Sequence, residues 1–388
     1  MSLPPDEDLV GAVRERLSRE PGELTPQRVA LALRAEGRPV GDATVLLVHE
    51  ALSRDVLGAG PLEPLLRQPE VTDVLVNGAA EVYVDRGHGL ERTEVTFRDE
   101  QSVRRLAQRL AARAGRRLDD ASPWVDLRLA DGTRFHAVLA PIARPGTTLS
   151  LRVPRGRVFS LEELVSAGSL TPAGGRLLTG IVEQRLAFLV TGATGCGKTT
   201  MLNTLLTLVR PEERLVLVED ASELRPEHAH VVALEARPAN IEGQGAVTVR
   251  DLVRQALRMR PDRLVVGEVR GAEVVELLAA LNTGHAGGCG TLHANAAADV
   301  PARIEALGLA AGLGRAATHS QLASAIDVVL HLARGPGGQR RLAEVAVPVR
   351  ADDGLVQMRV AARFSESGAL AAGPGSDQLA DALERRSE

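Results

Sequence analysis

The sequence predicts an α/β protein whose larger part is a parallel sheet flanked by helices. Three observations support this prediction. Apolar strand segments alternate with helical segments from residue 186 to residue 282, a glycine-rich motif at residues 192–199 joins the first strand to its helix, and two later strands end in carboxylates. Alternating strands and helices form parallel sheets, which bind ligands at the carboxyl ends of their strands.

Composition narrows the possible functions. Lys198 is the single lysine among 46 lysine and arginine residues, and it lies within the glycine-rich motif. Arg and Lys are nearly equivalent on a solvated surface, but a compact ammonium fits a tight phosphate-binding loop and a planar guanidinium does not. The net charge of −4 and the aromatic content of 2% weigh against a nucleic-acid track, which needs basic and stacking side chains.

The sequence favours a chain that stays in the cytoplasm. Its first residues lack a signal-peptide pattern, and its longest uncharged run, residues 277–298, is interrupted by Gly, Asn and His. The two cysteines, Cys196 and Cys289, lie in separate glycine-rich motifs. We therefore expect no disulfide framework, which agrees with a reducing compartment.

The first 155 residues divide into two predicted parts. Residues 1–57 have helical periodicity and predict a helical N-terminal extension, and residues 58–155 predict a small α/β domain. Asn77-Gly78 and Asp131-Gly132 predict turns between strands of that domain. Its expected elements are strands at 71–78, 81–85, 124–129, 133–139 and 148–153 and a helix at 102–114.

A linker at residues 154–158 leads into the larger predicted domain, residues 156–364. Its expected elements are strands at 186–191, 214–218 and 263–266 and helices at 198–208, 248–258 and 272–282. The tail, residues 365–388, is rich in Ala, Gly and Ser, and we expect it to be loosely ordered and flexible.

The glycine-rich motif matches the GxxxxGK[ST] pattern of a phosphate-binding loop. In such loops backbone N–H groups surround phosphate oxygens, the lysine reaches the β- and γ-phosphates, and the Ser/Thr hydroxyl binds Mg²⁺. We therefore expect a nucleoside triphosphate, with Lys198 on its phosphates and Thr199 on the metal. The predicted phosphate-binding residues are Gly192, Ala193, Thr194, Gly195, Cys196, Gly197, Lys198, Thr199 and Thr200.

Two strand ends supply candidate catalytic carboxylates beside Lys198. An apolar strand ends in Glu268, and Gly267 stands where many phosphate-loop enzymes have a metal-binding Asp. Glu268 is the candidate for polarising the attacking water, and the alternative is a solvated strand-end acid. Glu219 ends another strand and is expected near Glu268, because the ends of neighbouring parallel strands meet at one edge.

The segment 283–295 carries His285, Cys289 and His293 among glycines. Three interpretations are open: an ordinary glycine turn, a zinc site without an obvious fourth ligand, and a sensor segment that directs one imidazole at the γ-phosphate. We favour the sensor. The basic helix at 104–117 presents arginines on one face, which predicts a solvated face or a subunit contact rather than a lipid or nucleic-acid site.

Four segments together resemble the type II/IV secretion-system ATPase family, in particular its Tad/CpaF pilus-assembly branch. They are residues 192–200, 218–224, 258–271 and 283–295, and the likeness extends upstream through 71–78, 131–134 and 150–153. It covers about residues 55–335. Two features depart from the family. Gly288-Cys-Gly290 stands where Ser/Leu/Thr-type residues are common, and the zinc-binding cysteine module of type II export ATPases is absent.

The resemblance implies a hexameric ATPase that uses ATP and Mg²⁺. It implies a RecA-like P-loop motor domain capped by a smaller PAS-like domain, with Arg134 and Arg152 of the small domain closing over the phosphates. It also implies that Arg258, Arg260 and Arg270 reach phosphate or a neighbouring subunit. The resemblance further implies a protein located at the inner, cytoplasmic face of the cell membrane. Its expected partner is an integral-membrane platform protein of a pilus or secretion system.

Two other functions compete with this one. A RecA-like nucleic-acid translocase shares the motor but needs a basic track with aromatic residues, and we expect no nucleic acid as partner. A nucleotide-binding assembly module would bind ATP without hydrolysing it.

Overall fold

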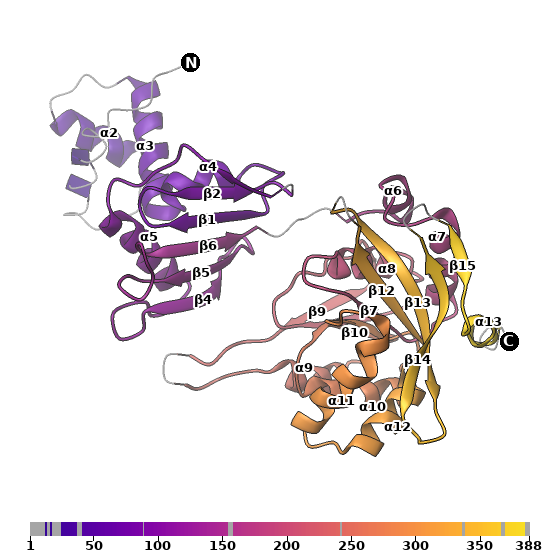
Figure 1. Cartoon of the computed structure of the whole chain (residues 1–388). Helices are drawn as coiled ribbons and strands as arrows, with labels where there is room; N and C mark the ends of the chain where they lie inside the picture. The colour runs from indigo at the N-terminus through magenta and orange to yellow at the C-terminus, as the bar shows by residue number, and fades with distance from the viewer. Residues whose placement is uncertain are drawn as a thin grey trace. The chain divides into compact units, whose positions relative to one another are not determined.

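The computed structural model describes residues 12–13, 16–17, 25–36, 41–87, 89–153, 158–240, 243–335, 338–365 and 369–384. The chain divides into two compact units, residues 1–155 and residues 156–388 (Figure 1). The predicted linker lies outside the described residues except at its last position. Parts of the predicted extension and the end of the predicted tail also lie outside them.

The first unit combines N-terminal helices with an antiparallel sheet. α2 (Pro26–Ala35) and α3 (Asp42–Leu57) contact each other through buried Val29, Leu33 and Val48. In the described residues the sheet has the order β3-β2-β1-β6-β5-β4 with antiparallel neighbours. The remaining elements are η1 (Gly60–Leu62), α4 (Glu63–Leu66), β1 (Asp73–Asn77), β2 (Val82–Asp85), β3 (Leu90–Arg92), α5 (Glu100–Arg113), β4 (Trp124–Arg128), β5 (Arg134–Val138) and β6 (Thr148–Arg152).

Helix α5 covers one face of this sheet because its apolar side chains recur at helical spacing. Val103, Leu106 and Leu110 are buried together with alternate residues of the strands. Asp99 caps the helix, and its carboxylate accepts a hydrogen bond from Ser102 N at 2.7 Å. The strands and the helix predicted for this region are confirmed, with ends displaced by one or two residues.

The second unit is built on a mixed sheet, whose described strands have the order β15-β14-β13-β12-β7-β11-β10-β8-β9. The strands from β12 to β9 in this order are parallel, and β13, β14 and β15 extend the sheet with antiparallel pairs. The strands are β7 (Phe188–Thr191), β8 (Leu215–Glu219), β9 (Val231–Glu235), β10 (Arg263–Val269), β11 (Cys289–Leu292), β12 (Val328–Arg334), β13 (Arg340–Arg350), β14 (Val356–Phe364) and β15 (Leu370–Ala372).

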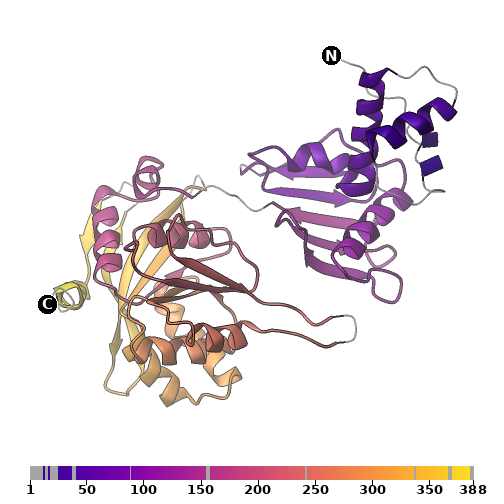
Figure 2. The ribbon, with the colours of Figure 1, turned by 180° about the vertical axis from the view of Figure 1, so that it is seen from behind.

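Helices cover both faces of this sheet (Figures 1 and 2). Leu215 and Leu217 of β8 belong to the hydrophobic core under α6, α7, α8 and α13, whereas Val216 and Val218 belong to the core under α9 to α12. Burial on both sides explains the continuous apolar runs of the parallel strands. The helices are α6 (Leu161–Ser166), α7 (Pro172–Glu183), α8 (Lys198–Thr207), α9 (Val249–Ala256), α10 (Glu273–Asn282), η2 (Ala297–Asp299), α11 (Val300–Ala310), α12 (Arg315–Ala325) and α13 (Ser376–Glu384).

The C-terminal segment differs from the flexible tail that composition predicts. β15 pairs with β14, and α13 buries Leu379 beside Phe364 in the core. Composition misleads here because small residues are needed for close packing: a side chain at Gly373 would collide with the carbonyl oxygen of Val360. Residues 370–384 are therefore part of the folded second unit.

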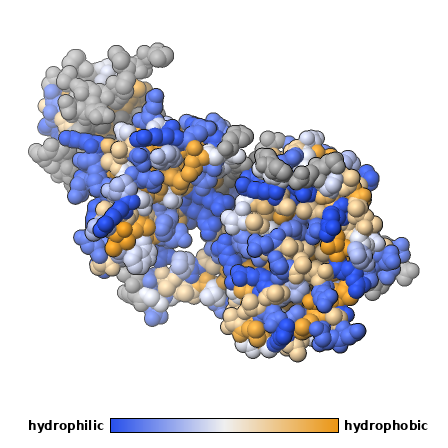
Figure 3. Space-filling view, in the orientation of Figure 1, coloured by the Kyte–Doolittle hydropathy of each residue, from blue (hydrophilic) through white to orange (hydrophobic). Residues whose placement is uncertain are grey.

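The described surface carries scattered apolar side chains. Leu31, Leu46 and Trp124 are each more than half exposed, and on the face shown in Figure 3 hydrophobic residues are interspersed with hydrophilic ones. Single exposed apolar residues are ordinary in folded proteins. None of the described helices combines the length and the apolar content that crossing a membrane requires.

Replacing Leu379 by Ala should destabilise the second unit if α13 is part of its core. Leu379 is 5% exposed, so we expect a loss of about 2–3 kcal/mol in the free energy of unfolding, measured by urea denaturation. Leu370→Ala is the matched control, because Leu370 is 50% exposed and should change stability by less than about 0.5 kcal/mol. Equal effects of the two substitutions would contradict a packed C-terminal helix.

Candidate functional site

The parallel ladder brings the carboxyl ends of β7, β11, β10 and β8 to one edge of the sheet. Thr191 at the end of β7 pairs with Leu292 at the end of β11, and Leu292 also pairs with Val269 of β10. Val266 of β10 pairs in turn with Val218 of β8. The residues that follow these strands therefore lie next to one another, although they are far apart in the sequence.

The phosphate loop joins β7 to α8 at this edge. Gly192, Gly195 and Gly197 have φ angles of 146°, 72° and 94°, a region that L side chains rarely adopt. Gly197 is the N-cap of α8 and, as a glycine, has no side chain that could accept a hydrogen bond from the first turn of that helix. The N–H groups and the positive end of the helix dipole are thus available to an anion, which agrees with the phosphate-binding motif.

Lys198 is 8% exposed and is surrounded by hydrogen-bond acceptors. Its Nζ donates to the carbonyl oxygens of Gly192 at 3.1 Å and Ala193 at 3.0 Å, and it lies 3.2 Å from Nδ1 of His293. Burial lowers the pKa of Lys198, because the charged form loses hydration. The ammonium is held at the mouth of the loop, in reach of a terminal phosphoryl group.

His293 and Arg270 connect this ammonium to the candidate carboxylates. His293 Nε2 lies 2.5 Å from Glu268 Oε1, and Arg270 donates to the other oxygen of Glu268 and to Asp220 Oδ2 at 2.6 Å. Burial, and next the charge of Lys198, lowers the pKa of His293 and favours the neutral imidazole. A row of polar groups therefore runs from Lys198 through His293 and Glu268 to Arg270.

Glu219 fills the space that an Asp at position 267 would need. A Cβ at Gly267 would lie 2.6 Å from Cγ of Glu219, so the glycine admits the glutamate from the neighbouring strand. Glu219 Oε1 accepts hydrogen bonds from the backbone N–H groups of Glu223 and Leu224 at 2.9 and 3.0 Å. Burial raises the pKa of Glu219 to about 7, despite these two bonds.

One buried carboxylate oxygen at this edge, Glu219 Oε2, has no hydrogen-bond partner among the described residues, and among them Glu268 Oε1 is approached by His293 Nε2 alone. Buried acceptors without donors are rare in folded proteins and commonly mark a place for water, an ion or a reacting group. With Thr199 at the start of α8, these oxygens fit a hydrated divalent cation and an attacking water. The residues present are therefore suited to a magnesium-bound nucleotide.

The two histidines of the segment 283–295 lie at opposite edges of the sheet. His293 directly follows β11 and joins the site, whereas His285 precedes that strand, and its Nδ1 lies 3.2 Å from the carbonyl oxygen of Ala280. β11 spans about 13 Å between them. Because a parallel strand carries its two ends to different edges, His285 lies at the edge away from the phosphate loop of the same unit, and its expected contact with nucleotide stays a prediction.

The zinc interpretation of the same segment is wrong. Cys289 is fully buried in the hydrophobic core, and burial raises the pKa of its thiol to about 12, away from the thiolate that zinc binds. In the portion of the chain that the structure describes, no three His, Cys, Asp or Glu side chains gather to hold a metal ion.

Arg134 and Arg152 belong to the first unit and face each other on adjacent strands. They are partners in the β5–β6 ladder, and both lie on the face opposite the buried Phe135 and Leu151. A pair of guanidinium groups on one exposed face is a suitable clamp for an anion. Their contact with nucleotide stays a prediction.

The arginines of α5 are used within the first unit. Arg104 donates to Asp120 at 2.5 Å, Arg105 donates to Ser102 Oγ at 2.9 Å, and Arg109 donates to the carbonyl oxygen of Gly58 at 3.0 Å. These contacts agree with a basic helix whose arginines form a solvated face of the protein. They give no support to the alternative function, a nucleic-acid translocase.

Several contacts of the site escape sequence reasoning. Thr191 Oγ1 lies 3.0 Å from Nδ1 of His331 in β12, and Thr291 Oγ1 donates to the carbonyl oxygen of Gly267 at 2.7 Å. Asp220, which follows β8, accepts a hydrogen bond from Arg270, which follows β10. The residues of these pairs are 24 to 140 positions apart in the sequence, and no local pattern signals which strands will be neighbours.

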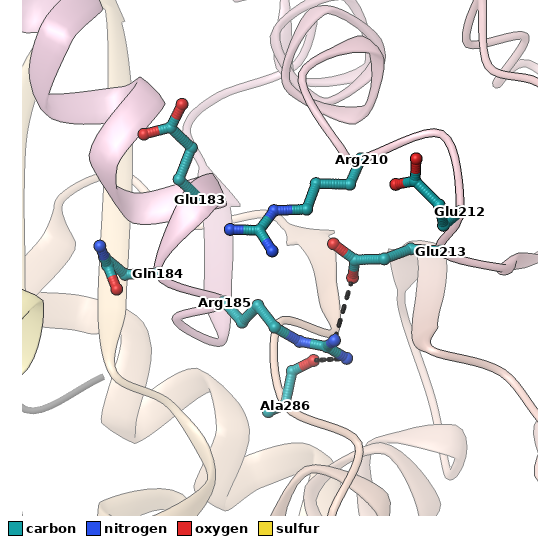
Figure 4. Close-up of a pocket in the computed structure, with 7 residues that line it drawn as sticks. All are labelled: Glu183, Gln184, Arg185, Arg210, Glu212, Glu213 and Ala286. Atoms are coloured by element: carbon teal, nitrogen blue, oxygen red, sulfur yellow. Dashed lines mark hydrogen bonds and ion pairs between the residues drawn. The ribbon is translucent and has the colours of Figure 1, made fainter. Parts of the chain in front are cut away.

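A polar cavity of about 770 Å³ lies at the other edge of the sheet (Figure 4). Arg185 forms part of its wall, with NH1 3.4 Å from Glu213 Oε2 and NH2 3.5 Å from the carbonyl oxygen of Ala286. These residues precede β7, β8 and β11, and the exposed Arg258 and Arg260 likewise precede β10. None of them reaches the phosphate loop of the same unit.

The second unit has three layers, a mostly parallel sheet between two layers of helices, and a phosphate loop joins β7 to α8 at the edge of that sheet. This arrangement defines a RecA-like P-loop motor domain. The model of the type II/IV secretion system protein family matches residues 55–363. The chain belongs to this family. The sequence-based resemblance is thereby confirmed at the level of the family.

Relatives and solved structures agree with this assignment. A putative conjugal transfer protein of Mycobacterium tuberculosis is 59% identical over 324 residues, 82% of this chain and 92% of that protein. The type IV secretion system protein PtlH of Bordetella pertussis is 31% identical, over 73% and 92% of the two chains. The pilus retraction motor PilT has the same fold, with a TM-score of 0.53 at 21% identity, over 75% of this chain and 83% of that one.

Replacing Gly267 by Ala should displace Glu219 and disturb the site. The added methyl would meet the middle of the Glu219 side chain rather than its mobile end, so we expect a loss of about 1–3 kcal/mol in the free energy of unfolding. Gly314→Ala is the control, because Gly314 has open space around it and φ of −64°. A Gly267→Ala variant as stable as this control would show that Glu219 does not need the space.

Glu219→Gln should change stability in a pH-dependent way. Because the pKa of Glu219 is raised from 4.5 to about 7, the folded state disfavours its charge, and wild-type stability falls as pH rises from 4.5 to 7. The amide removes this cost, so we expect the metal-free variant to gain about 3 kcal/mol over wild type at pH 8. Near pH 4.5 the gain should vanish, as measured by urea unfolding in EDTA. The same gain at both pH values would be incompatible with a buried, titrating carboxyl.

Proposed function

We propose that this chain is a Mg²⁺-dependent ATPase that works as a homo-hexameric ring. The observation that carries this proposal is the row formed by Lys198, His293 and Glu268 beside the phosphate loop. The solved ATPase DotB of Legionella pneumophila shares the fold, with a TM-score of 0.52, 19% identity and coverage of 74% of this chain and 79% of that one. PilT, which also shares it, holds ADP.

The contacts of each residue allow a definite role. A γ-phosphate beside Lys198 would replace His293 as hydrogen-bond acceptor, because a phosphate oxygen is charged and a neutral imidazole is not. Glu268 Oε1 would accept the proton of the attacking water, while Arg270 holds the other oxygen in place. Thr199 would hold Mg²⁺ with Glu219 close by, and the metal would offset charge that develops on the phosphates.

Further parts of the proposal concern the assembly. Arg134 and Arg152 would close over the phosphates from the first unit and so link nucleotide state to the arrangement of the two units. The work would serve Tad/Flp-type pilus assembly or type II/IV secretion, through an integral-membrane platform protein at the cytoplasmic face of the membrane. The family assignment supports a role in such a system.

Glu268→Gln should abolish turnover while nucleotide binding persists. Loss of the proton acceptor should lower kcat for phosphate release by about 100-fold or more, with the Kd for MgATP within about twofold of wild type. Glu344→Gln, on β13 and ion-paired with the exposed Arg363, is the control and should retain wild-type turnover. Background turnover in the wild-type ring would favour a non-hydrolysing assembly module instead.

The oligomeric state can be measured independently of turnover. Light scattering of the Glu268→Gln protein with MgATP should give six times the protomer mass if the ring forms. A monomer or dimer under these conditions would contradict the hexamer and leave the hydrolysis proposal standing.

A further inference from the structure

A pair of arginines from β12 and β13 holds the phosphate loop from the side. Arg334 ends β12 and Arg340 begins β13, and the two are partners in the antiparallel ladder. Arg334 NH2 donates to the carbonyl oxygen of Gly195 at 2.8 Å, and Arg340 Nε donates to the same oxygen at 3.0 Å. One carbonyl at the centre of the loop thus accepts two charge-assisted hydrogen bonds.

The glycines of the loop are in close contact with the same two strands. A Cβ at Gly195 would lie 2.9 Å from Arg334 NH2, and a Cβ at Gly197 would lie 3.3 Å from Cδ of Arg340. At Gly192 it would lie 2.5 Å from the carbonyl oxygen of Leu332 in β12. The loop therefore rests against β12 and the start of β13 at Gly192, Gly195 and Gly197.

The position of the Gly195 carbonyl determines where the next N–H group points. In a trans peptide the carbonyl and the following N–H are directed to opposite sides. With Gly195 O fixed toward the two guanidinium groups, the N–H of Cys196 is directed to the opposite side of the peptide. Its present acceptor, the carbonyl oxygen of Ala193, is 3.4 Å away, a long bond that a phosphate oxygen could readily replace.

Charge adds to this geometric effect. Hydrogen bonds from guanidinium groups polarise the peptide and make its N–H a stronger donor. Two cations hydrogen-bonded to Gly195 O also make the electrostatic potential of the loop more positive and so favour an anion within it.

We propose that Arg334 and Arg340 are positioning residues for the nucleoside di- or triphosphate. They act through the Gly195 carbonyl and hold the Gly195–Cys196 peptide in the orientation that binds phosphate. This inference rests on the proposed nucleotide-binding function. The phosphate-loop motif does not contain these residues, and they follow Lys198 by more than 130 positions.

A purely structural role would give a different result, which makes the inference testable. Both arginines are exposed, and exposed hydrogen bonds contribute little to the stability of the fold. Their removal should weaken nucleotide binding without a comparable loss of stability. Arg363, an exposed arginine on β14 that pairs with Glu344, provides a control for the loss of positive charge from the same sheet.

The experiment compares Arg334→Gln, Arg340→Gln, the double variant and Arg363→Gln. Calorimetric titration with MgADP and MgATP should show about tenfold weaker binding for the double variant, equal for the two nucleotides, and smaller losses for the single variants. KM for MgATP should rise while kcat at saturation stays within about twofold, because the reacting groups are untouched. Arg340→Lys should recover part of the affinity, since an ammonium can also donate to Gly195 O.

Either of two results would overturn the inference. One is wild-type nucleotide affinity in the double variant. The other is a loss of affinity that accompanies an equally large drop in the melting temperature of the nucleotide-free protein, since this would make the pair structural. If the wild-type protein itself fails to bind MgADP, the proposed function is wrong, and this inference is overturned with it. That outcome differs from the two above because it is seen without any substitution.

Discussion

The ammonium of Lys198 is the charge around which the site is arranged. A buried cation is costly unless hydrogen-bond acceptors replace its lost hydration. Two loop carbonyls and one imidazole supply these acceptors. Each can yield to a phosphate oxygen, which is a better partner for a cation. In the proposed function, the same group that stabilises the loop would also bind the polyphosphate, and its contact with His293 connects the loop to the carboxylate that would activate water.

The parallel sheet brings residues that are far apart in the sequence together in one site. β7, β11, β10 and β8 each contribute the residue at or after their carboxyl end, so the order of strands in the sheet decides which side chains become neighbours. Gly267 shows how closely this is constrained. Its missing side chain is the space into which Glu219 extends from the next strand. A carboxylate on β8 thus lies where many phosphate-loop enzymes place one on the strand that corresponds to β10.

The strands β12 and β13 add a second support to the loop. β12 lies beside β7 in the sheet, places His331 under Thr191, and presents Arg334 to Gly195. β13 adds Arg340 to the same carbonyl. A phosphate loop is usually considered as a strand, a turn and a helix. Here a fourth structural element, the strand β12, contacts it, and the chain continues from β12 through β13 and β14 to the C-terminal helix of the unit.

The sequence by itself determined the local features: the phosphate loop, the strands that end in Glu219 and Glu268, and most elements up to residue 282. Loop glycines, strand-end acids and helical periodicity depend on near neighbours in the sequence, and the phosphate-loop motif with its single lysine can be recognised without knowledge of the fold.

Only the tertiary structure separated His293 from His285, paired Glu268 with Arg270, and placed Arg334 and Arg340 on the loop. It also showed that the Ala- and Gly-rich C-terminal segment is packed. These features depend on which strands become neighbours and on which edge of the sheet a residue reaches. Both are set by burial of the whole sheet between two layers of helices, which no short stretch of sequence encodes.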